Sequence, residues 1–264
     1  MSVQLFDIKN KVALVTGATH GLGMAMAKGL GLAGATIIIN GNSSQTKIDT
    51  AVNEFKELGI KTHGFKFDVT DEAQVKKVIA DIEKNIAPID ILVNNAGIIK
   101  RTPLVDMEVE DFKEVLNVDL VSPFIVSKHV VKNMMNRKEG KIINICSMMS
   151  ELGRNSVGAY AAAKGGLKML TQNMATEWAK FNIQVNGIGP GYFATSQTEP
   201  IRVDGHPFNE FIINRTPAAK WGDPNDFAGA AIFLSSKASD FVNGHILYVD
   251  GGILATIGKP SNEI

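Results

Sequence analysis

The chain has 264 residues, of which 45% are hydrophobic and 20% are charged. This composition suits a folded protein with a large buried core and excludes a disordered chain. Lys plus Arg and Asp plus Glu are balanced at 27 each, so no net basic field exists to attract nucleic acid or an anionic membrane surface. The composition therefore favours chemistry on small molecules, with no nucleic-acid or membrane partner.

Cysteine usage and the lack of targeting patterns indicate a cytoplasmic protein. Cys146 is the single cysteine, so it cannot form an internal disulfide, and no paired Cys/His spacing indicates a zinc site. The first ten residues lack a signal-peptide pattern, and no apolar run reaches the ~18 residues needed to span a bilayer. We therefore expect a cytoplasmic location, no metal and no membrane insertion.

Seven short β-rich runs alternate with longer stretches of helical periodicity, as in a parallel sheet built from βαβ units. In one such stretch, Ile48, Ala51, Phe55 and Leu58 recur at helical spacing, and Gly59 stands where that helix would end. No linker divides the chain, so we predict a single α/β domain over residues 1–264, a doubly wound Rossmann fold with a parallel sheet of about seven strands. The expected strands are residues 12–16, 36–40, 62–67, 89–94, 141–147, 183–188 and 246–250.

Residues 191–216 form one long stretch without clear periodicity. Loops of this length in compact domains are often active-site lids, so we expect a substrate lid here. The alternative interpretation is a tolerated surface insertion.

A glycine-rich loop separates the first expected strand from the first helix. Its glycines permit a tight turn and a close approach of the backbone to a pyrophosphate, whose charge the helix N-terminus stabilises. Any tight turn between a strand and a helix can use glycine, but the position of this loop favours a dinucleotide site. The residues expected to contact the dinucleotide here are Gly17, Thr19, His20, Gly21, Leu22 and Gly23.

The order Thr-Gly-x-x-x-Gly-x-Gly at residues 16–23 resembles the short-chain dehydrogenase/reductase family, and further matches follow across nearly the whole chain. The resemblance implies an NAD(P)-dependent oxidoreductase that moves a hydride between the cofactor and a carbonyl or secondary alcohol. It implies that Asp68 and Val69 contact the adenine of the cofactor, and that Pro190 and Gly191 lie beside its nicotinamide. Asn95, Ala96 and Gly97 match the family's cofactor-supporting motif and are expected to bind the cofactor as well.

The end of the second expected strand leaves the choice between NAD(H) and NADP(H) open. An acidic residue normally binds the ribose hydroxyls of NAD at this position, but here the strand ends at Asn40, which we expect to contact the cofactor. No arginine stands nearby to pair with a 2′-phosphate, and His20 and Lys47 are weak substitutes.

Tyr160 and Lys164 stand four residues apart in an Ala-rich helical stretch, so they share one helix face. An ammonium beside a phenol stabilises the phenolate, whereas burial of the phenol opposes ionisation. This arrangement, with Ser147 at the end of the fifth strand, matches the catalytic Ser, Tyr and Lys of the family. It predicts Tyr160 as the acid/base, Ser147 as the donor that holds the reacting oxygen, and contacts of Tyr160 and Lys164 with the cofactor.

The chain departs from the family at Asp119, where many members have a catalytic asparagine. This departure weakens any assignment of the family's proton relay to this chain.

Residues 98–103, 146–154 and 243–255 resemble the sugar-acid dehydrogenases of the family, the group of gluconate 5-dehydrogenase and the enzymes of keto-deoxy sugar acids. The implied reaction interconverts gluconate and 5-ketogluconate, or 2-keto-3-deoxygluconate and a 3-deoxy-2,5-diketo acid. The planar fork of an arginine suits the carboxylate of such a substrate, and hydroxyl contacts could come from the expected lid. The expected substrate contacts are Arg101, Ser147, Met149, Arg154, Gln197 and His206.

Two other functions remain open from the sequence. A reductase of 3-oxoacyl thioesters or small ketones would share the catalytic residues, and a nucleotide-sensing module would keep the fold without the chemistry. The segment 243–255 resembles the family's C-terminal strand, which implies a homotetramer.

Overall fold

The computed structural model describes residues 3–196 and 198–258, and a parallel sheet of seven strands forms the centre of this part of the chain. The strand order is β3-β2-β1-β4-β5-β6-β7, and every neighbouring pair is parallel. The predicted doubly wound fold is confirmed. The strands are β1 (Val12–Val15), β2 (Thr36–Gly41), β3 (Thr62–Lys66), β4 (Ile91–Asn94), β5 (Gly140–Ile145), β6 (Ile183–Pro190) and β7 (Ile246–Val249).

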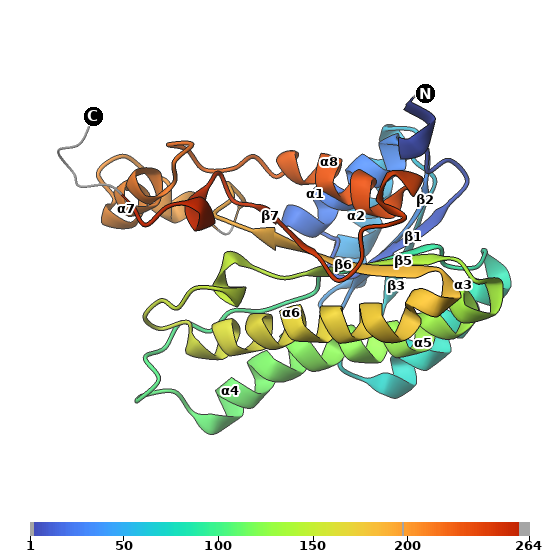
Figure 1. Ribbon diagram of the computed structural model, residues 1–264, viewed down its shortest axis with the longest axis horizontal. Coiled ribbons are helices and arrows are strands. Elements are labelled where there is room, and N and C mark those ends of the chain that lie inside the picture. Colours follow the sequence, from blue (N-terminus) through green and yellow to red (C-terminus); the bar gives the residue numbers. More distant parts are fainter. Residues whose placement is uncertain (1–2, 197, 259–264) are drawn as a thin grey trace.

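Helices cover both faces of the sheet. The helices are α1 (Gly21–Leu32), α2 (Gln45–Glu57), α3 (Glu72–Asn85), α4 (Val109–Leu116), α5 (Ser122–Arg137), α6 (Gly158–Trp178), α7 (Pro207–Arg215) and α8 (Asp226–Ser235). α1, α2 and α8 pack on one face, whereas α3, α5 and α6 pack on the other (Figure 1). The predicted helix that contains Phe55 is α2, and Gly59 follows it with a left-handed φ of +74°.

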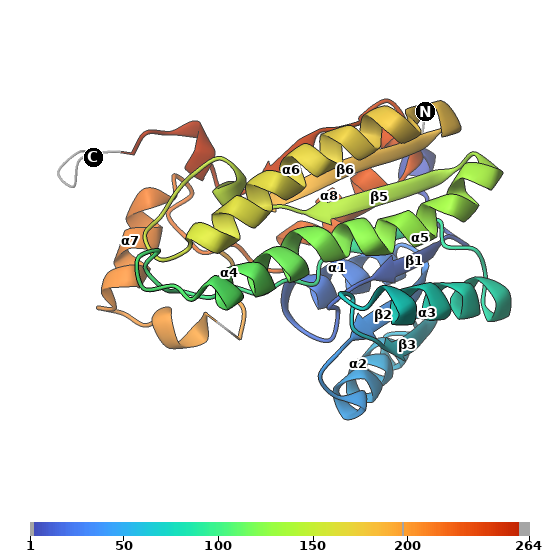
Figure 2. The same ribbon diagram turned by 90° about the horizontal axis from the view of Figure 1, so that it is seen from below.

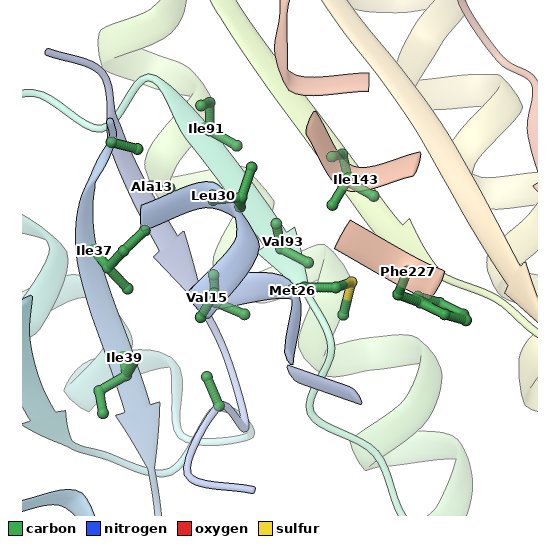
Figure 3. Close-up of a cluster of buried hydrophobic side chains, with 14 of the residues drawn as sticks. Ala13, Val15, Met26, Leu30, Ile37, Ile39, Ile91, Val93, Ile143 and Phe227 are labelled. Carbon is green, nitrogen blue, oxygen red and sulfur yellow. The ribbon is translucent and has the colours of Figure 1, made fainter. Parts of the chain in front are cut away.

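The core is split by the sheet into two layers of apolar side chains. Successive residues of β1 point to opposite faces, so Ala13 and Val15 pack beneath α1 and α8, while Val12 and Leu14 pack on the opposite side. Both faces of β1 are therefore apolar, which explains why its sequence is a continuous apolar run. Figure 3 shows the first layer, with Val15, Ile37, Ile39, Ile91, Val93 and Ile143 of the strands facing Met26 and Leu30 of α1 and Phe227 of α8.

A π-helical turn, η2 (Asn117–Val121), joins α4 to α5. The three elements form one long rod that runs beside α6 (Figure 2). π-Helical turns are rare and occur frequently at functional sites. Here the turn places Asp119, whose side chain is fully buried, against α6.

The segment 191–216, expected to lack regular structure, contains helix α7. Pro207 occupies the first turn of this helix, and the Nδ1 atom of His206 accepts the N–H of Phe208 at 3.1 Å. The buried positions of α7 are Asn209 and Ile212, and the Oδ1 atom of Asn209 accepts the indole N–H of Trp221 at 2.7 Å. Because the polar residue Asn209 occupies a buried position of α7, the sequence lacks the apolar periodicity from which a helix is usually predicted.

Across the described residues, no helix combines the length and the apolar character that a membrane span requires.

Candidate active site

A cleft of about 1000 Å³ opens at the carboxyl ends of the central strands, where parallel α/β sheets bind their ligands. Every residue predicted above for the site lines this cleft except Gln197 and His206. Gln197 lies outside the described residues. His206 caps α7 through its ring nitrogen, and its predicted contact with substrate hydroxyls stays a prediction.

The loop between β1 and α1 forms an open cradle of backbone. Gly17 and Gly21 have φ values of +62° and +60°, in the left-handed region that favours glycine. A Cβ atom on Gly23 would lie 2.3 Å from the Asn95 amide nitrogen and 2.6 Å from the Gly17 carbonyl oxygen. α1 begins at Gly21, so the unpaired N–H groups of its first turn face the cleft and fit a pyrophosphate.

Hydrogen bonds from the loop after β4 hold this cradle in shape. The side-chain amide of Asn95 donates to the carbonyls of Thr16 at 2.9 Å and Gly17 at 3.0 Å. The Thr16 hydroxyl oxygen in turn accepts the backbone N–H groups of Asn95 and Ala96. The cradle is thus preformed, and Asn95 acts on it by positioning the glycine loop.

The end of the cleft next to β2 is polar and carries one carboxylate. Asn40 is 2% exposed, and its side chain accepts the N–H of Gly17 at 3.2 Å and donates to the carbonyl of Phe67 at 2.9 Å. Asp68 accepts the hydroxyl of Thr70 at 2.7 Å and the amide of Asn42 at 3.1 Å. Asn40 therefore holds the glycine loop in place through its hydrogen bond to Gly17. Its position at the end of the second strand predicted only a contact with the cofactor.

The structure brings Ser147, Tyr160 and Lys164 together at one wall of the cleft. Ser147 precedes a short helical turn, η3 (Met148–Ser150), and its Oγ accepts the N–H of Met149 at 3.1 Å. Tyr160 and Lys164 lie on one face of α6, with the Lys164 Nζ 5.5 Å from the centre of the Tyr160 ring. The Lys164 ammonium, which is almost fully buried, donates to the Ile145 carbonyl at 2.9 Å.

Asp119 is a fourth polar residue at this wall, and the sequence did not predict its contacts. One carboxyl oxygen accepts the N–H of Ile98 at 2.7 Å, and the other lies 3.2 Å from the Nζ of Lys164. Burial raises the pKa of the Asp119 carboxyl, and the Lys164 ammonium partly opposes that rise. Burial lowers the pKa of Lys164, but Asp119 and Tyr160 outweigh it and the net shift is upward.

Arg154 and Arg101 bring two guanidinium groups to the opposite end of the cleft. The Arg154 guanidinium lies 4.9 Å from the centre of the Phe208 ring on α7, and its Nη1 donates to the Tyr192 hydroxyl at 3.4 Å. Its Nε is buried and has no hydrogen-bond partner among the described residues. Arg154 therefore has a donor available for a ligand, because buried N–H groups are otherwise almost always paired.

Tyr192 is a residue of this end of the cleft that the sequence analysis missed. Its ring meets the rings of Phe208 and Trp221 edge to face, with centroids 5.8 Å and 5.9 Å apart. Burial raises the pKa of its phenol, while Arg154 opposes the rise. The only signal in the sequence was its place directly after Pro190 and Gly191.

Comparison with known proteins agrees with this geometry. The family model for short chain dehydrogenases matches residues 11–205. The chain is 81% identical to a 2-dehydro-3-deoxy-D-gluconate 5-dehydrogenase of Formosa agariphila, over the full length of both chains. It is 48% identical to a 5-keto-D-gluconate 5-reductase of Escherichia coli, over 96% of this chain and 99% of that protein.

Solved structures show the same likeness. A gluconate 5-dehydrogenase from Burkholderia cenocepacia, in complex with NADP and tartrate, superposes with a TM-score of 0.92 at 43% identity, over 96% of this chain and 99% of that chain. A 2-keto-3-deoxy-D-gluconate dehydrogenase from Streptococcus agalactiae does so with a TM-score of 0.84 at 56% identity, over 97% and 98% of the two chains.

Fold and comparisons together define an oxidoreductase that uses a nicotinamide dinucleotide. The chain belongs to the short-chain dehydrogenase family. It is an enzyme that acts on CH–OH groups with NAD(H) or NADP(H).

Gly23→Ala should weaken dinucleotide binding, because the new Cβ would displace the Asn95 amide and the Gly17 carbonyl. We expect a rise in Kd of at least about tenfold in a fluorescence titration with NADH or NADPH, corresponding to roughly 1.4 kcal/mol. Gly229→Ala is the matched control, because this glycine lies in α8 with open space around its Cβ position. An unchanged Kd in Gly23→Ala would contradict the cradle.

Proposed function

We propose that the enzyme interconverts a sugar acid and its keto form. The observation that carries this proposal is the presence of two arginines, Arg101 and Arg154, in the same cleft as Ser147, Tyr160 and Lys164. A guanidinium binds a carboxylate through two parallel hydrogen bonds, and a sugar acid supplies that carboxylate beside its reacting carbon skeleton. The names of the relatives, which are sugar-acid dehydrogenases and reductases, support the same substrate class.

Two substrate pairs fit this class: gluconate with 5-ketogluconate, and 2-keto-3-deoxygluconate with a 3-deoxy-2,5-diketo acid. The 81% identity to a 2-dehydro-3-deoxy-D-gluconate 5-dehydrogenase favours the second pair. The pairs differ at few positions of the substrate, so one or two contacts decide between them.

Tyr160 is the proposed acid/base. The nicotinamide, when bound, supplies or accepts the hydride. Tyr160 protonates the carbonyl oxygen in reduction and takes the alcohol proton in oxidation. Since the Ser147 Oγ already accepts the N–H of Met149, its hydroxyl hydrogen is left to donate to the reacting oxygen. The Lys164 ammonium, fixed by the Ile145 carbonyl, stabilises negative charge on the phenol oxygen.

The alternatives differ from this proposal at the arginines and at the catalytic wall. The substrates of a 3-oxoacyl thioester or small-ketone reductase have no carboxylate beside the reacting carbonyl for Arg154 to bind. A nucleotide-sensing module performs no hydride transfer and therefore does not require Ser147, Tyr160 and Lys164. The homotetramer, the cytoplasmic location and the lid role of residues 191–216 stay predictions of the resemblance and of the sequence.

The substrate class is tested by comparing kcat/KM for 5-ketogluconate, a 3-deoxy-2,5-diketo sugar acid and an acetoacetyl thioester, each with NADH and with NADPH. Cofactor oxidation measured by absorbance gives the rates. We expect kcat/KM for a sugar acid to exceed that for the thioester by roughly 10- to 100-fold, since one charged hydrogen-bonded pair accounts for about 1.5–3 kcal/mol. Turnover of the thioester alone would overturn the proposal.

Tyr160→Phe should bind the dinucleotide normally but lose most turnover. Loss of a positioned general acid typically slows a reaction by roughly 10²- to 10⁴-fold, and kcat should fall in that range in both directions. Tyr248→Phe is the control, because Tyr248 does not line the cleft. Its hydroxyl donates a hydrogen bond of 2.6 Å to Glu151. Near-normal kcat in Tyr160→Phe would show that another group transfers the proton.

Arg101→Ala and Arg154→Ala should each raise KM for a sugar acid by about tenfold or more, and change KM for an uncharged ketone much less. Lys100→Ala serves as the control, because Lys100 neighbours Arg101 in the chain but its charge is paired with Asp111 and Glu114. Equal effects on charged and uncharged substrates would refute the carboxylate role.

A further inference from the structure

A carboxylate is buried in direct contact with the ammonium that assists Tyr160. Asp119 has no exposed surface, and its Oδ2 lies 3.2 Å from the Nζ of Lys164. Its Oδ1 takes the N–H of Ile98, and a Cβ on Gly97 would lie 3.0 Å from Oδ2, so Gly97 leaves room for this oxygen. The acid/base scheme above gives this carboxylate no role.

The groups that face Lys164 come from three elements. The end of β5 contributes the Ile145 carbonyl and is followed by the Cys146 thiol, α6 contributes the Tyr160 phenol, and η2 contributes Asp119. Burial raises the pKa of Cys146 to about 11, so this thiol is uncharged at neutral pH.

Two further charged groups, Glu151 and Lys168, lie near Cys146 and pair with each other. Among the described groups that act directly on Lys164, Asp119 is therefore the carboxyl group within ion-pair distance of the ammonium. A carboxylate in contact with an ammonium cancels much of the field that the ammonium exerts on a third group.

We propose that Asp119 sets the pH range of the reaction by offsetting the charge of Lys164 at Tyr160. The phenol then receives less electrostatic assistance in losing its proton than it would with an uncharged side chain at position 119. Ketone reduction needs the protonated phenol, so its activity extends to higher pH. Alcohol oxidation needs the ionised phenol, so the pH at which its rate rises is also higher. The inference rests on the proposed role of Tyr160 and makes Asp119 a positioning residue.

A purely structural role is the competing explanation. The Ile98 N–H needs an acceptor, and Asp119 would serve it equally well if the carboxyl were protonated. Asp119→Asn separates the two explanations, because the amide oxygen can still accept the Ile98 N–H while the charge is removed.

The test is the pH profile of kcat/KM for alcohol oxidation in the wild type and in Asp119→Asn. We expect the profile of the variant to move to lower pH by about one unit, the size of shift that a single charge several ångströms away produces in a partly buried site. The pH at which ketone reduction declines should move in the same direction. Glu114→Gln removes another carboxylate that lines the cleft without contact to Lys164, and its profile should coincide with that of the wild type.

Two results would overturn the inference. A profile of Asp119→Asn that coincides with the wild type would show that the charge is without effect. A move to higher pH would show that Asp119 acts by keeping Lys164 protonated. If the proposed role of Tyr160 is wrong, Tyr160→Phe retains turnover. If only the inference is wrong, Tyr160→Phe is inactive while the Asp119→Asn profile does not move to lower pH.

A measurement on the wild type keeps the inference testable if Asp119→Asn does not fold. The ultraviolet tyrosinate absorbance of the wild type, minus that of Tyr160→Phe, reports the ionisation of Tyr160 without any change at position 119. We expect no tyrosinate signal in this difference at neutral pH in the absence of cofactor. A clear signal there would contradict the inference.

Discussion

The parallel pairing of β1 with β4 is the constraint on which the glycine-loop end of the cleft depends. Leu14 pairs with Leu92 and Val15 with Val93, and the Thr16 N–H donates to the Val93 carbonyl at 3.0 Å. This register delivers Thr16 opposite Asn95, where the two residues exchange side-chain and backbone hydrogen bonds. A slip of one residue would turn every side chain of the strand to the other face and separate these partners, so the glycine cradle is fixed by the core.

The wall of the cleft that carries Ser147, Tyr160 and Lys164 depends in a similar way on the burial of Lys164. A buried ammonium is costly unless hydrogen-bond acceptors or an opposite charge surround it. The Ile145 carbonyl at the end of β5 and the Asp119 carboxylate in η2 meet this requirement from two different layers of the fold. The position of α6, and with it the position of Tyr160, is therefore tied to the sheet and to the rod formed by α4, η2 and α5. The π-helical turn is where that rod turns a polar side chain inward.

The sequence predicted most of the fold because its signals are local. Strands such as β1 and β4 are short, largely apolar runs, and the glycines of residues 16–23 mark a tight turn in which a Cβ on Gly17 or Gly23 would meet neighbouring atoms. That Tyr160 and Lys164 share one face of α6 was predictable for the same reason, since it follows from helical spacing alone.

The parts that the sequence did not reveal depend on tertiary contacts. The π-helical turn brings the Asp119 carboxyl within 3.2 Å of the Lys164 Nζ. The residue pattern of 109–137 does not predict such a turn. Arg154 and Tyr192 are 38 positions apart and meet only because the loop after β5 and the segment after β6 leave the same edge of the sheet. Helix α7 was missed because its buried face contains Asn209 instead of an apolar residue.

The two ends of the cleft are therefore held by different kinds of interaction. At the glycine-loop end, the groups in position are mostly backbone atoms and glycines fixed by the sheet register, and a Cβ on Gly17 or Gly23 would collide with them. At the substrate end, Arg154, Tyr192 and Phe208 come from separate segments and hold one another through ring and guanidinium contacts. A change of one of these side chains would therefore alter the shape and charge of this end of the cleft without disturbing the sheet that holds the glycine loop.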